Sequence, residues 1–331
     1  MILYTVIEKT NILIFPSSQK GDFTMANVKT RRGILFYLKR DWQLYLLLLF
    51  PITAVIIFKY IPLSGLVIAF KDYDVIKGFA NSKWIGFDIF KEIFRMKGFY
   101  RVLRNTLVLN LLDLIVGFPA PIILAILLNE VKNATFKKIS QTILYLPHFI
   151  SWVIIGGIMY QLLSTRSGML NSLLNKLGKE SIPFLTERYH WVVTYVLVGV
   201  WQTMGWGTII YLAAISGINH EYYEAATVDG AKRLAKIIYI TIPCIRPTIV
   251  TLLILNLGRI MGSNFERVYS MGNPIVMEFS DVISTFVYNV GLKSYRYNVA
   301  TAVGMFQSVV GFILVIIADR VAKRIGESGL I

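Results

Sequence analysis

The sequence reads Glu224-Ala225-Ala226-Thr227-Val228-Asp229-Gly230 at the centre of a short polar segment, and Ile240-Thr241-Ile242-Pro243 precedes the next apolar stretch. Just upstream, Asn219 has a side chain that can cap a helix, and Glu221 adds negative charge to its first turn. Gly230 can take the left-handed conformation that ends a helix. We therefore expect a helix of about three turns in this segment, set between two long apolar stretches.

The surface of this predicted helix suits contact with another protein. Its two alanines keep one side shallow, so that a partner can approach the backbone closely. Tyr222 and Tyr223 add aromatic contact area, which protein interfaces favour. The alternative is an ordinary amphipathic connector that happens to contain two alanines and a glycine.

The chain as a whole is too apolar for a soluble domain. Hydrophobic residues make up 55% of its 331 residues, charged residues make up 16%, and the mean hydropathy is +0.60. Several apolar windows reach the length of about 20 residues that a helix needs to cross a bilayer. We expect six spans, at residues 44–70, 102–128, 139–163, 191–215, 245–263 and 299–318.

The distribution of charge predicts how these spans are oriented. The net charge of +15 does not indicate nucleic-acid binding, because the basic residues lie in short runs beside apolar spans. The acid-free basic run at 29–40 directly precedes the first span and places the N-terminus in the cytosol. Six spans return the C-terminus to that side. The predicted fold is therefore an all-α polytopic membrane protein with a cytosolic helix between spans four and five.

Three regions follow from this arrangement. Residues 1–43 form a cytosolic N-terminal segment, residues 44–318 form the six-span domain with the polar loop 216–243, and residues 319–331 form a cytosolic tail. Within the first region, Met25 opens a stretch that looks like a natural beginning, so residues 1–24 could be an upstream extension of the reading frame. They contain no secretory signal pattern.

Several classes of chemistry lack sequence support. The single cysteine, Cys244, excludes an internal disulfide, and three widely separated histidines make no zinc-binding pattern. The sequence also lacks a Gly-x-x-x-x-Gly-Lys-Ser/Thr phosphate loop, so ATP-driven work must be done by another chain. We expect a chain that is not an enzyme and binds no metal or cofactor itself.

Five side chains inside the predicted spans are candidates for lining a solute path, because polar groups at membrane depth usually face a bundle interior or water. Gln202 and Trp206 are four residues apart, and Asn256 and Arg259 are three apart, so each pair shares a helix face. An aromatic ring beside a hydrogen-bonding group suits a sugar, and an arginine suits the carboxylate of a uronate. The five are Asp113, Gln202, Trp206, Asn256 and Arg259.

Each of these candidates has a simpler alternative. Asp113 and Arg259 could pair with each other or with a partner chain, Gln202 could join two helices, and Trp206 could face lipid or the core. The span glycines could act as hinges, although small residues more commonly let helices pack closely. These glycines are Gly156, Gly157, Gly199, Gly205 and Gly207.

The polar loop resembles the EAA loop of ABC-importer permeases, with Ile242 at the position before Pro243 where the family usually has leucine. Further stretches are similar to carbohydrate-uptake permeases, and most of all to the subgroup associated with oligosaccharides cut from complex polysaccharides. The similarity extends over residues 31–327. The stretches are Arg40-Asp41-Trp42-Gln43-Leu44-Tyr45, Ile68-Ala69-Phe70-Lys71-Asp72-Tyr73, Asn105-Thr106-Leu107, Leu127-Leu128-Asn129-Glu130, Trp201-Gln202 with Gly205-Trp206, and Ala322-Lys323-Arg324-Ile325-Gly326-Glu327.

The resemblance implies that the loop docks on a cytosolic ATPase subunit and couples ATP use to transport. The residues implied in coupling are Tyr222, Glu224, Ala225, Ala226, Asp229, Gly230, Ile240 and Pro243. It also implies a bacterial plasma membrane, a second homologous permease, two ABC ATPase subunits that use ATP and Mg, an extracellular solute-binding protein and an oligosaccharide substrate. The alternatives are a permease for a phosphate ester, a polyamine or a peptide, and a non-transporting scaffold for an ATPase.

Overall fold

The computed structural model describes residues 13–16, 23–26, 40–262, 264–326 and 329. The chain forms two compact units, Met1–Gly65 and Leu66–Ile331. Most of the predicted extension 1–24 and the end of the predicted tail lie outside the described residues. The candidate sites all lie in the second unit.

The first unit contains a short hairpin and a long helical segment. Strands β1 (Leu13–Pro16) and β2 (Phe23–Ala26) pair in antiparallel fashion. Helix α3 (Trp42–Val55) continues through η1 (Ile56–Tyr60) into η2 (Ile61–Phe70), whose residues from Leu66 onward belong to the second unit. No residue of α3 is buried although nearly all are apolar, which is the pattern of a helix that contacts lipid.

Five helical segments of the described chain are long and apolar enough to cross a membrane, and they correspond to predicted spans one, two, four, five and six. The last helix continues through Arg324, so the tail predicted from residue 319 begins as helix. The prediction of an all-α polytopic membrane protein is confirmed. The five segments are Trp42–Phe70, Lys97–Glu130, Arg188–Ser216, Arg233–Gly258 and Tyr297–Arg324.

These spans and their connections are built from shorter elements. The spans of the second unit comprise α6 (Lys97–Leu112), η3 (Asp113–Gly117), α7 (Pro119–Glu130), α11 (Arg188–Ser216), α13 (Arg233–Lys236), η5 (Ile237–Thr241), α14 (Ile242–Gly258) and α18 (Tyr297–Arg324). The connections contain β3 (Lys71–Asp72), α4 (Gly78–Asn81), β4 (Lys83–Trp84), α5 (Asp88–Arg95), α10 (Met169–Lys176), α12 (His220–Val228), α15 (Phe265–Met271), α16 (Met277–Ser280), α17 (Ile283–Val287) and η6 (Tyr288–Lys293).

The third predicted span, residues 139–163, is bent and not a single continuous helix. Helix α8 (Ala134–Tyr145) with η4 (Leu146–Phe149) meets α9 (Trp152–Leu163) at a bend of 100°. Pro147 has no backbone N–H and disfavours helical continuation, and Ser151 caps a new helix by accepting a hydrogen bond from the Ile154 backbone N–H. The segment is therefore a broken span or a re-entrant loop.

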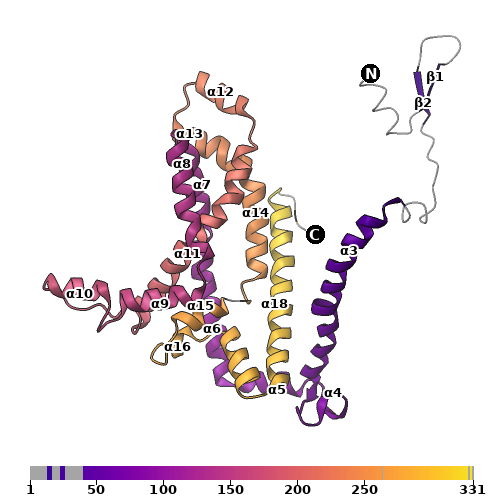
Figure 1. The fold of residues 1–331 in the computed structure, drawn as a ribbon, viewed down its shortest axis with the longest axis vertical. Helices are drawn as coiled ribbons and strands as arrows, with labels where there is room; N and C mark the ends of the chain where they lie inside the picture. Colours follow the sequence, from indigo (N-terminus) through magenta and orange to yellow (C-terminus); the bar gives the residue numbers. More distant parts are fainter. Residues whose placement is uncertain (1–12, 17–22, 27–39, 263, 327–328, 330–331) are drawn as a thin grey trace. The chain divides into compact units, whose positions relative to one another are not determined.

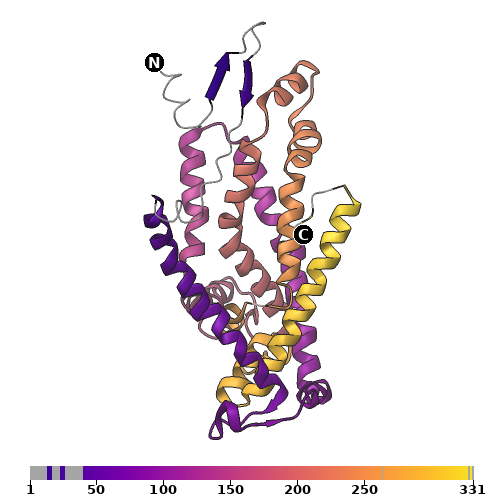
Figure 2. The same ribbon diagram turned by 90° about the vertical axis from the view of Figure 1, so that its right-hand side faces the viewer.

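Helix α11 is the most enclosed of the candidate spans. Of its most apolar stretch, 39% is buried, against 17% or less in each of the others. One apolar cluster packs Trp191 and Tyr195 of α11 with Ile155 of α9 and Val268 of α15. Elsewhere in the unit, α14 and α18 run side by side (Figures 1 and 2). Side chains of α11 are thus placed to line the interior of the bundle.

Close packing accounts for four of the five span glycines. At these four positions an added Cβ would come within 3.0 Å of another element, whereas Gly157 has open space around it. This agrees with the packing interpretation of the four. The four contacts are Gly156 with Ser270, Gly199 with Arg267, Gly205 with Leu144 and Gly207 with Pro121.

A first prediction concerns Gly205, where α11 lies against the backbone of α8. We expect Gly205→Ala to destabilise the protein by about 1–3 kcal/mol, because the new methyl group would overlap the Leu144 carbonyl. Thermal unfolding of the purified transporter measures this effect. Gly157→Ala is the matched control, since its methyl group enters open space. Equal melting temperatures for the two variants would contradict the proposed close packing.

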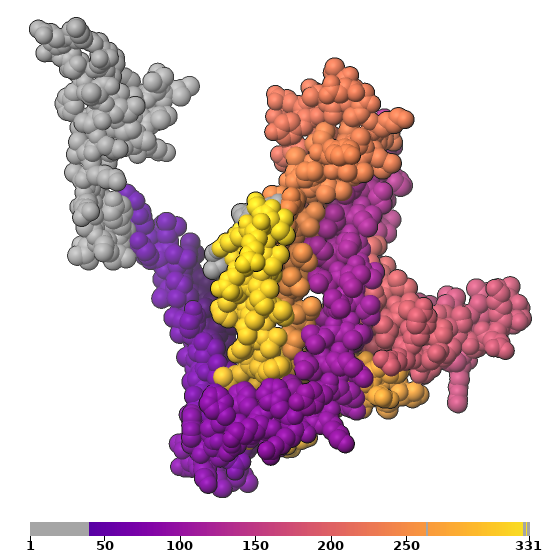
Figure 3. All heavy atoms as spheres, turned by 180° about the vertical axis from the view of Figure 1, so that it is seen from behind, coloured from indigo at the N-terminus to yellow at the C-terminus, as the bar shows by residue number. Residues whose placement is uncertain are grey.

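Helix α12 lies at one end of the second unit, away from α15 and α16 (Figure 1). Together with α13 it forms the outermost part of that end, whereas α10 projects from the side of the unit (Figure 3). All residues of α12 except Tyr223 and Ala226 are exposed. The segment that the sequence singles out is therefore a protruding surface element.

Candidate functional site

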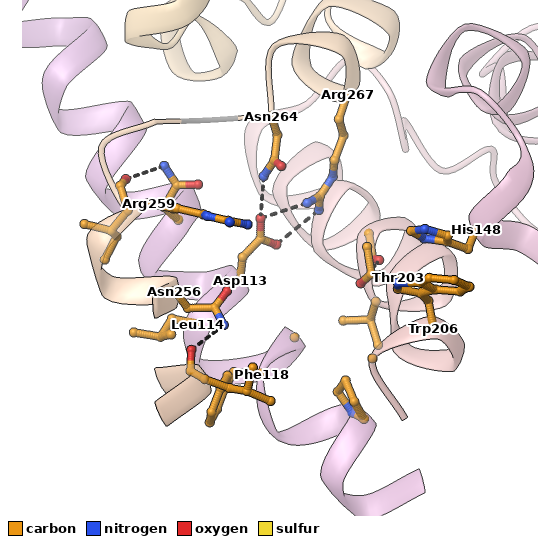
Figure 4. A pocket seen from close by; sticks show the side chains of 18 of the residues that line it. Asp113, Leu114, Phe118, His148, Thr203, Trp206, Asn256, Arg259, Asn264 and Arg267 are labelled. Carbon is orange, nitrogen blue, oxygen red and sulfur yellow. Dashed lines mark hydrogen bonds and ion pairs between the residues drawn. The ribbon is translucent and has the colours of Figure 1, made fainter. Parts of the chain in front are cut away.

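A cavity of about 500 Å³ lies among the spans of the second unit. Its walls come from α6 with η3, from α11, from the end of α14, and from the segment that leads into α15. Figure 4 shows its polar side chains converging from these elements. Residues more than 100 positions apart in the chain thereby line one cavity.

Four of the five predicted path residues line this cavity: Asp113, Trp206, Asn256 and Arg259. Gln202 does not line it. That side chain is only 6% exposed, and its amide Nε2 donates a hydrogen bond of 3.4 Å to the His148 carbonyl. Its position fits the alternative in which it joins two helical elements.

Asp113 is held by an arginine that the sequence did not single out. Arg267 donates to both carboxylate oxygens of Asp113, at 2.8 and 3.2 Å, and Asn264 donates at 3.3 Å. Among the described residues, the ion pair of Asp113 is with Arg267 and not with Arg259, which was one of the simpler alternatives. Because the carboxylate of Asp113 is already neutralised, it does not offer a free negative charge to a solute.

Arg267 is one of the most enclosed charged residues of the described chain, with 4% of its surface exposed. Its guanidinium lies 3.6 Å from the centre of the Tyr195 ring and also donates to the Tyr195 carbonyl. Gly199 leaves the space that the guanidinium occupies. Helix α15 thus inserts a cation beside the cavity and fixes it with an ion pair and an aromatic ring.

Sequence reasoning missed Arg267 because it falls in a connection expected to lie outside the membrane. A weak signal was present, since Val268 and Met271 repeat at helical spacing next to it and are both buried. That pattern predicts a packed helix but not its depth. His148 was also missed. Its ring stacks on Trp206 with centroids 4.7 Å apart and planes 5° apart, and no local pattern predicts that contact.

The remaining lining residues form a potential binding surface. Trp206 has one ring face against His148 and remains 45% exposed. Arg259, at the end of α14, points into the cavity (Figure 4) and forms no ion pair with a carboxylate in the part of the chain that the structure describes. Asn256 donates to the Leu252 carbonyl at 2.8 Å, which leaves its amide oxygen as an acceptor. An open ring, an amide and an unpaired guanidinium suit an anionic carbohydrate.

The protruding helix α12 has the local structure that the sequence predicts. The Asn219 side chain accepts a hydrogen bond of 3.1 Å from the Glu221 backbone N–H. Gly230 has a φ of +75° and follows the last turn. The helix is His220–Val228, about two and a half turns rather than three. Both of its ends are therefore set by local hydrogen bonding and backbone conformation.

The predicted coupling residues lie on and beside this helix. Glu224 and Ala225 are exposed, and Glu224 has no hydrogen bond or ion pair with a described residue. Tyr222 is 56% exposed. The others follow in order: Ala226 in the helix, Asp229 at its C-cap, Gly230 after it, Ile240 in η5 and Pro243 in the first turn of α14. This leaves a carboxylate and a shallow alanine surface free to meet another protein.

Two side-chain contacts tie α12 to the start of the fifth span. The Tyr223 hydroxyl lies 2.9 Å from Oγ1 of Thr241, which is 3% exposed. Lys236 donates a hydrogen bond of 2.7 Å to Oγ1 of Thr227. A displacement of α12 would therefore be passed to η5 and α14, which contains Asn256 and is followed directly by Arg259.

Comparison with known protein families places these features in context. Residues 105–327 match the family described as "binding-protein-dependent transport system inner membrane component". That range contains the whole cavity and the whole of α12.

Individual relatives and solved structures are similar over most of the chain. Protein LplB of Bacillus subtilis (strain 168) is 45% identical over 88% of this chain and 92% of its own length. The polygalacturonan/rhamnogalacturonan transport system permease protein YteP of the same organism is 42% identical over 93% of this chain and 96% of its own length. A solved structure is also similar: the crystal structure of a bacterial alginate ABC transporter in complex with an alginate pentasaccharide-bound periplasmic protein. One of its chains is 42% identical and has a TM-score of 0.82, and the match covers 90% of this chain and 100% of that one.

Proposed function

This chain belongs to the family of inner-membrane components of binding-protein-dependent transport systems, and we propose that it helps import oligosaccharides released from acidic polysaccharides. Members of this family are permease subunits of ABC transporters. The chain is accordingly a membrane transport subunit and not an enzyme, and ATP is used by separate subunits. The named substrates of its relatives include polygalacturonan, rhamnogalacturonan and alginate, the last described as an acidic polysaccharide.

The observation that carries this proposal is the position of Arg259. Its guanidinium faces the cavity without a carboxylate partner among the described residues, whereas Asp113 is occupied by Arg267. Arg259 directly follows the span Arg233–Gly258 and is exposed, so its guanidinium is accessible to an anionic ligand in the cavity. A uronate supplies a carboxylate for Arg259, and its ring can stack on the exposed face of Trp206.

The proposed assembly contains this chain, a second homologous permease, two cytosolic ATPase subunits and an extracellular solute-binding protein. In this proposed assembly the chain lies in the plasma membrane of a bacterial cell. Helix α12 and both chain termini lie in the cytosol. Closure of the ATPase subunits moves α12, and the Tyr223–Thr241 contact passes that movement to α14. The cavity then opens alternately to the two sides of the membrane, and no covalent step takes place in this chain.

A second prediction tests the role of Arg259. We expect Arg259→Ala to lower uptake of acidic oligosaccharides about tenfold or more, because a hydrogen bond to a charged group contributes about 1.5–3 kcal/mol. Uptake of labelled galacturonate oligosaccharides into proteoliposomes that hold the full transporter measures this effect. Arg259→Lys should retain part of the activity, since it keeps the charge but loses the bidentate geometry.

Arg95→Ala is the matched control, because Arg95 is an exposed arginine on α5 that does not line the cavity. Unchanged uptake by Arg259→Ala would remove the uronate contact from the proposal. ATPase stimulation by a phosphate ester, a polyamine or a peptide would instead favour another solute class. A reconstituted complex that hydrolyses ATP but moves no solute would favour the scaffold alternative.

A further inference from the structure

A second cavity, of about 390 Å³, lies between α6 and the N-terminal end of α11, the end of α11 that is farther from α12 along the chain. It shares no lining residue with the first cavity. Its exposed lining residues, here called the mouth, include Arg104, Glu187, Arg188 and Tyr189, whereas the less exposed apolar residues Leu109, Val192 and Phe279 form what is here called the floor. A charged mouth above an apolar floor suits an amphipathic ligand.

The guanidinium of Arg104 is held in place at this mouth. Asn105 is 4% exposed, and its amide nitrogen donates to the carbonyls of Glu278 and Asp281, each at 2.9 Å. Its amide oxygen in turn accepts hydrogen bonds from Nε and Nη2 of Arg104, at 3.4 and 3.2 Å. Nη1 of Arg104 makes no such contact with Asn105, so the side chain is oriented and still has donors for a ligand.

The second arginine at the mouth has no acidic partner. Arg188 forms no ion pair with a carboxylate among the residues the structure describes, and the adjacent Glu187 lies 2.5 Å from His190 Nδ1. Glu187 also lines the cavity, so two guanidinium groups and one carboxylate leave the mouth with a net charge of +1. An anionic group is the complementary ligand.

Both arginines stand where their helices become apolar. After Arg104, α6 contains no further charged residue, and α11 contains no Asp, Glu, Lys or Arg after Arg188. Tyr189 is 71% exposed, and exposed tyrosines are enriched where helices pass through the membrane–water interface. This places the mouth of the cavity at the level of lipid headgroups.

An exposed apolar strip continues from the cavity toward the middle of the two spans. Leu111 of α6 and Ile115 of η3 extend it, at 49% and 60% exposed, and Val193 and Leu197 extend it along α11, at 39% and 59%. Their spacing at three or four residues keeps each set on one helix face. A soluble sugar gains little from such a strip, whereas an acyl chain can lie along it.

We propose that this second cavity binds the phosphate headgroup of an anionic phospholipid between Arg104 and Arg188, with its acyl chains along the apolar strip. The lipid belongs to the leaflet on the side away from α12. This site is independent of the proposed oligosaccharide path, because it involves other residues and a different face of α6.

Native mass spectrometry of the full transporter in detergent tests this proposal, with phosphatidylglycerol and phosphatidylcholine of identical acyl chains added in separate titrations. We expect preferential retention of phosphatidylglycerol. Arg104→Gln and Arg188→Gln should each weaken phosphatidylglycerol binding about fivefold, because each removes one positive charge near the anionic headgroup. The double variant should weaken it about 25-fold, since the two effects multiply. Arg104→Lys should retain most of the binding, and Arg166→Gln, an exposed arginine outside both cavities, should leave it unchanged.

Size-exclusion chromatography confirms that each variant still assembles before lipid is counted. Equal binding of the two lipids, or full phosphatidylglycerol binding by the double variant, would overturn the proposal. Displacement of the lipid by a soluble galacturonate oligosaccharide would assign the cavity to sugar instead. A disulfide between the Tyr189→Cys variant and a cysteine of the second permease would show that a protein covers the cavity, which also rejects a lipid site. None of these results depends on uptake, so they are distinct from a failure of the proposed transport function.

Discussion

Asp113→Leu is expected to destabilise the protein by about 3–5 kcal/mol, because it leaves the Arg267 guanidinium buried without its counter-charge. The paired atoms are 2.8 Å apart, and the Arg267 side chain is only 5% exposed. Arg267→Met should destabilise by a similar amount, since it leaves Asp113 uncompensated. The melting temperature and the yield of assembled transporter measure both effects.

The double variant Asp113→Leu/Arg267→Met provides the decisive control. A buried ion pair replaced by apolar residues of similar volume often costs little, so the double variant should recover most of the stability that each single variant loses. If the losses of the two single variants simply add in the double variant, the two side chains do not act as a pair. Uptake measured alongside would show whether the pair, besides holding α15 in place, affects transport.

Glu224→Ala should abolish most ATP-driven uptake while leaving the subunit folded. Glu224 is exposed and has no described partner within the chain, so its removal breaks no internal contact. If it pairs with a basic residue of an ATPase subunit, truncation costs about 2–5 kcal/mol of binding, which corresponds to about 30-fold or more in affinity. Uptake into proteoliposomes and co-purification of the ATPase subunit measure the two consequences.

Glu180→Ala is the matched control, because Glu180 is an exposed glutamate in the connection before α11, far from α12 in the chain. Gly230→Val tests the same helix in another way. The φ of +75° at Gly230 is unfavourable for a β-branched residue, so the end of α12 would have to rearrange. Normal uptake and normal ATPase retention by both Glu224→Ala and Gly230→Val would remove α12 from the coupling mechanism.

The short polar helix could be predicted closely because its determinants are local. The Asn219 cap acts over two residues, and Gly230 ends the helix through its own backbone conformation. The spans could be predicted because about 20 consecutive apolar residues have few other environments available to them. The third span differed because Pro147 and Ser151 break it, and hydropathy averaged over a window does not register one proline and one cap.

Composition and local pattern in the chain thus establish the membrane class, most of the spans and the position and limits of α12, because each depends on residues that are close together in sequence. The structure was needed to identify the partner of Asp113, the stacking of His148 on Trp206 and the lack of a carboxylate partner for Arg259 among the described residues. Those features depend on the depth and rotation of helices relative to one another. Packing between distant segments sets both, and no local pattern encodes them.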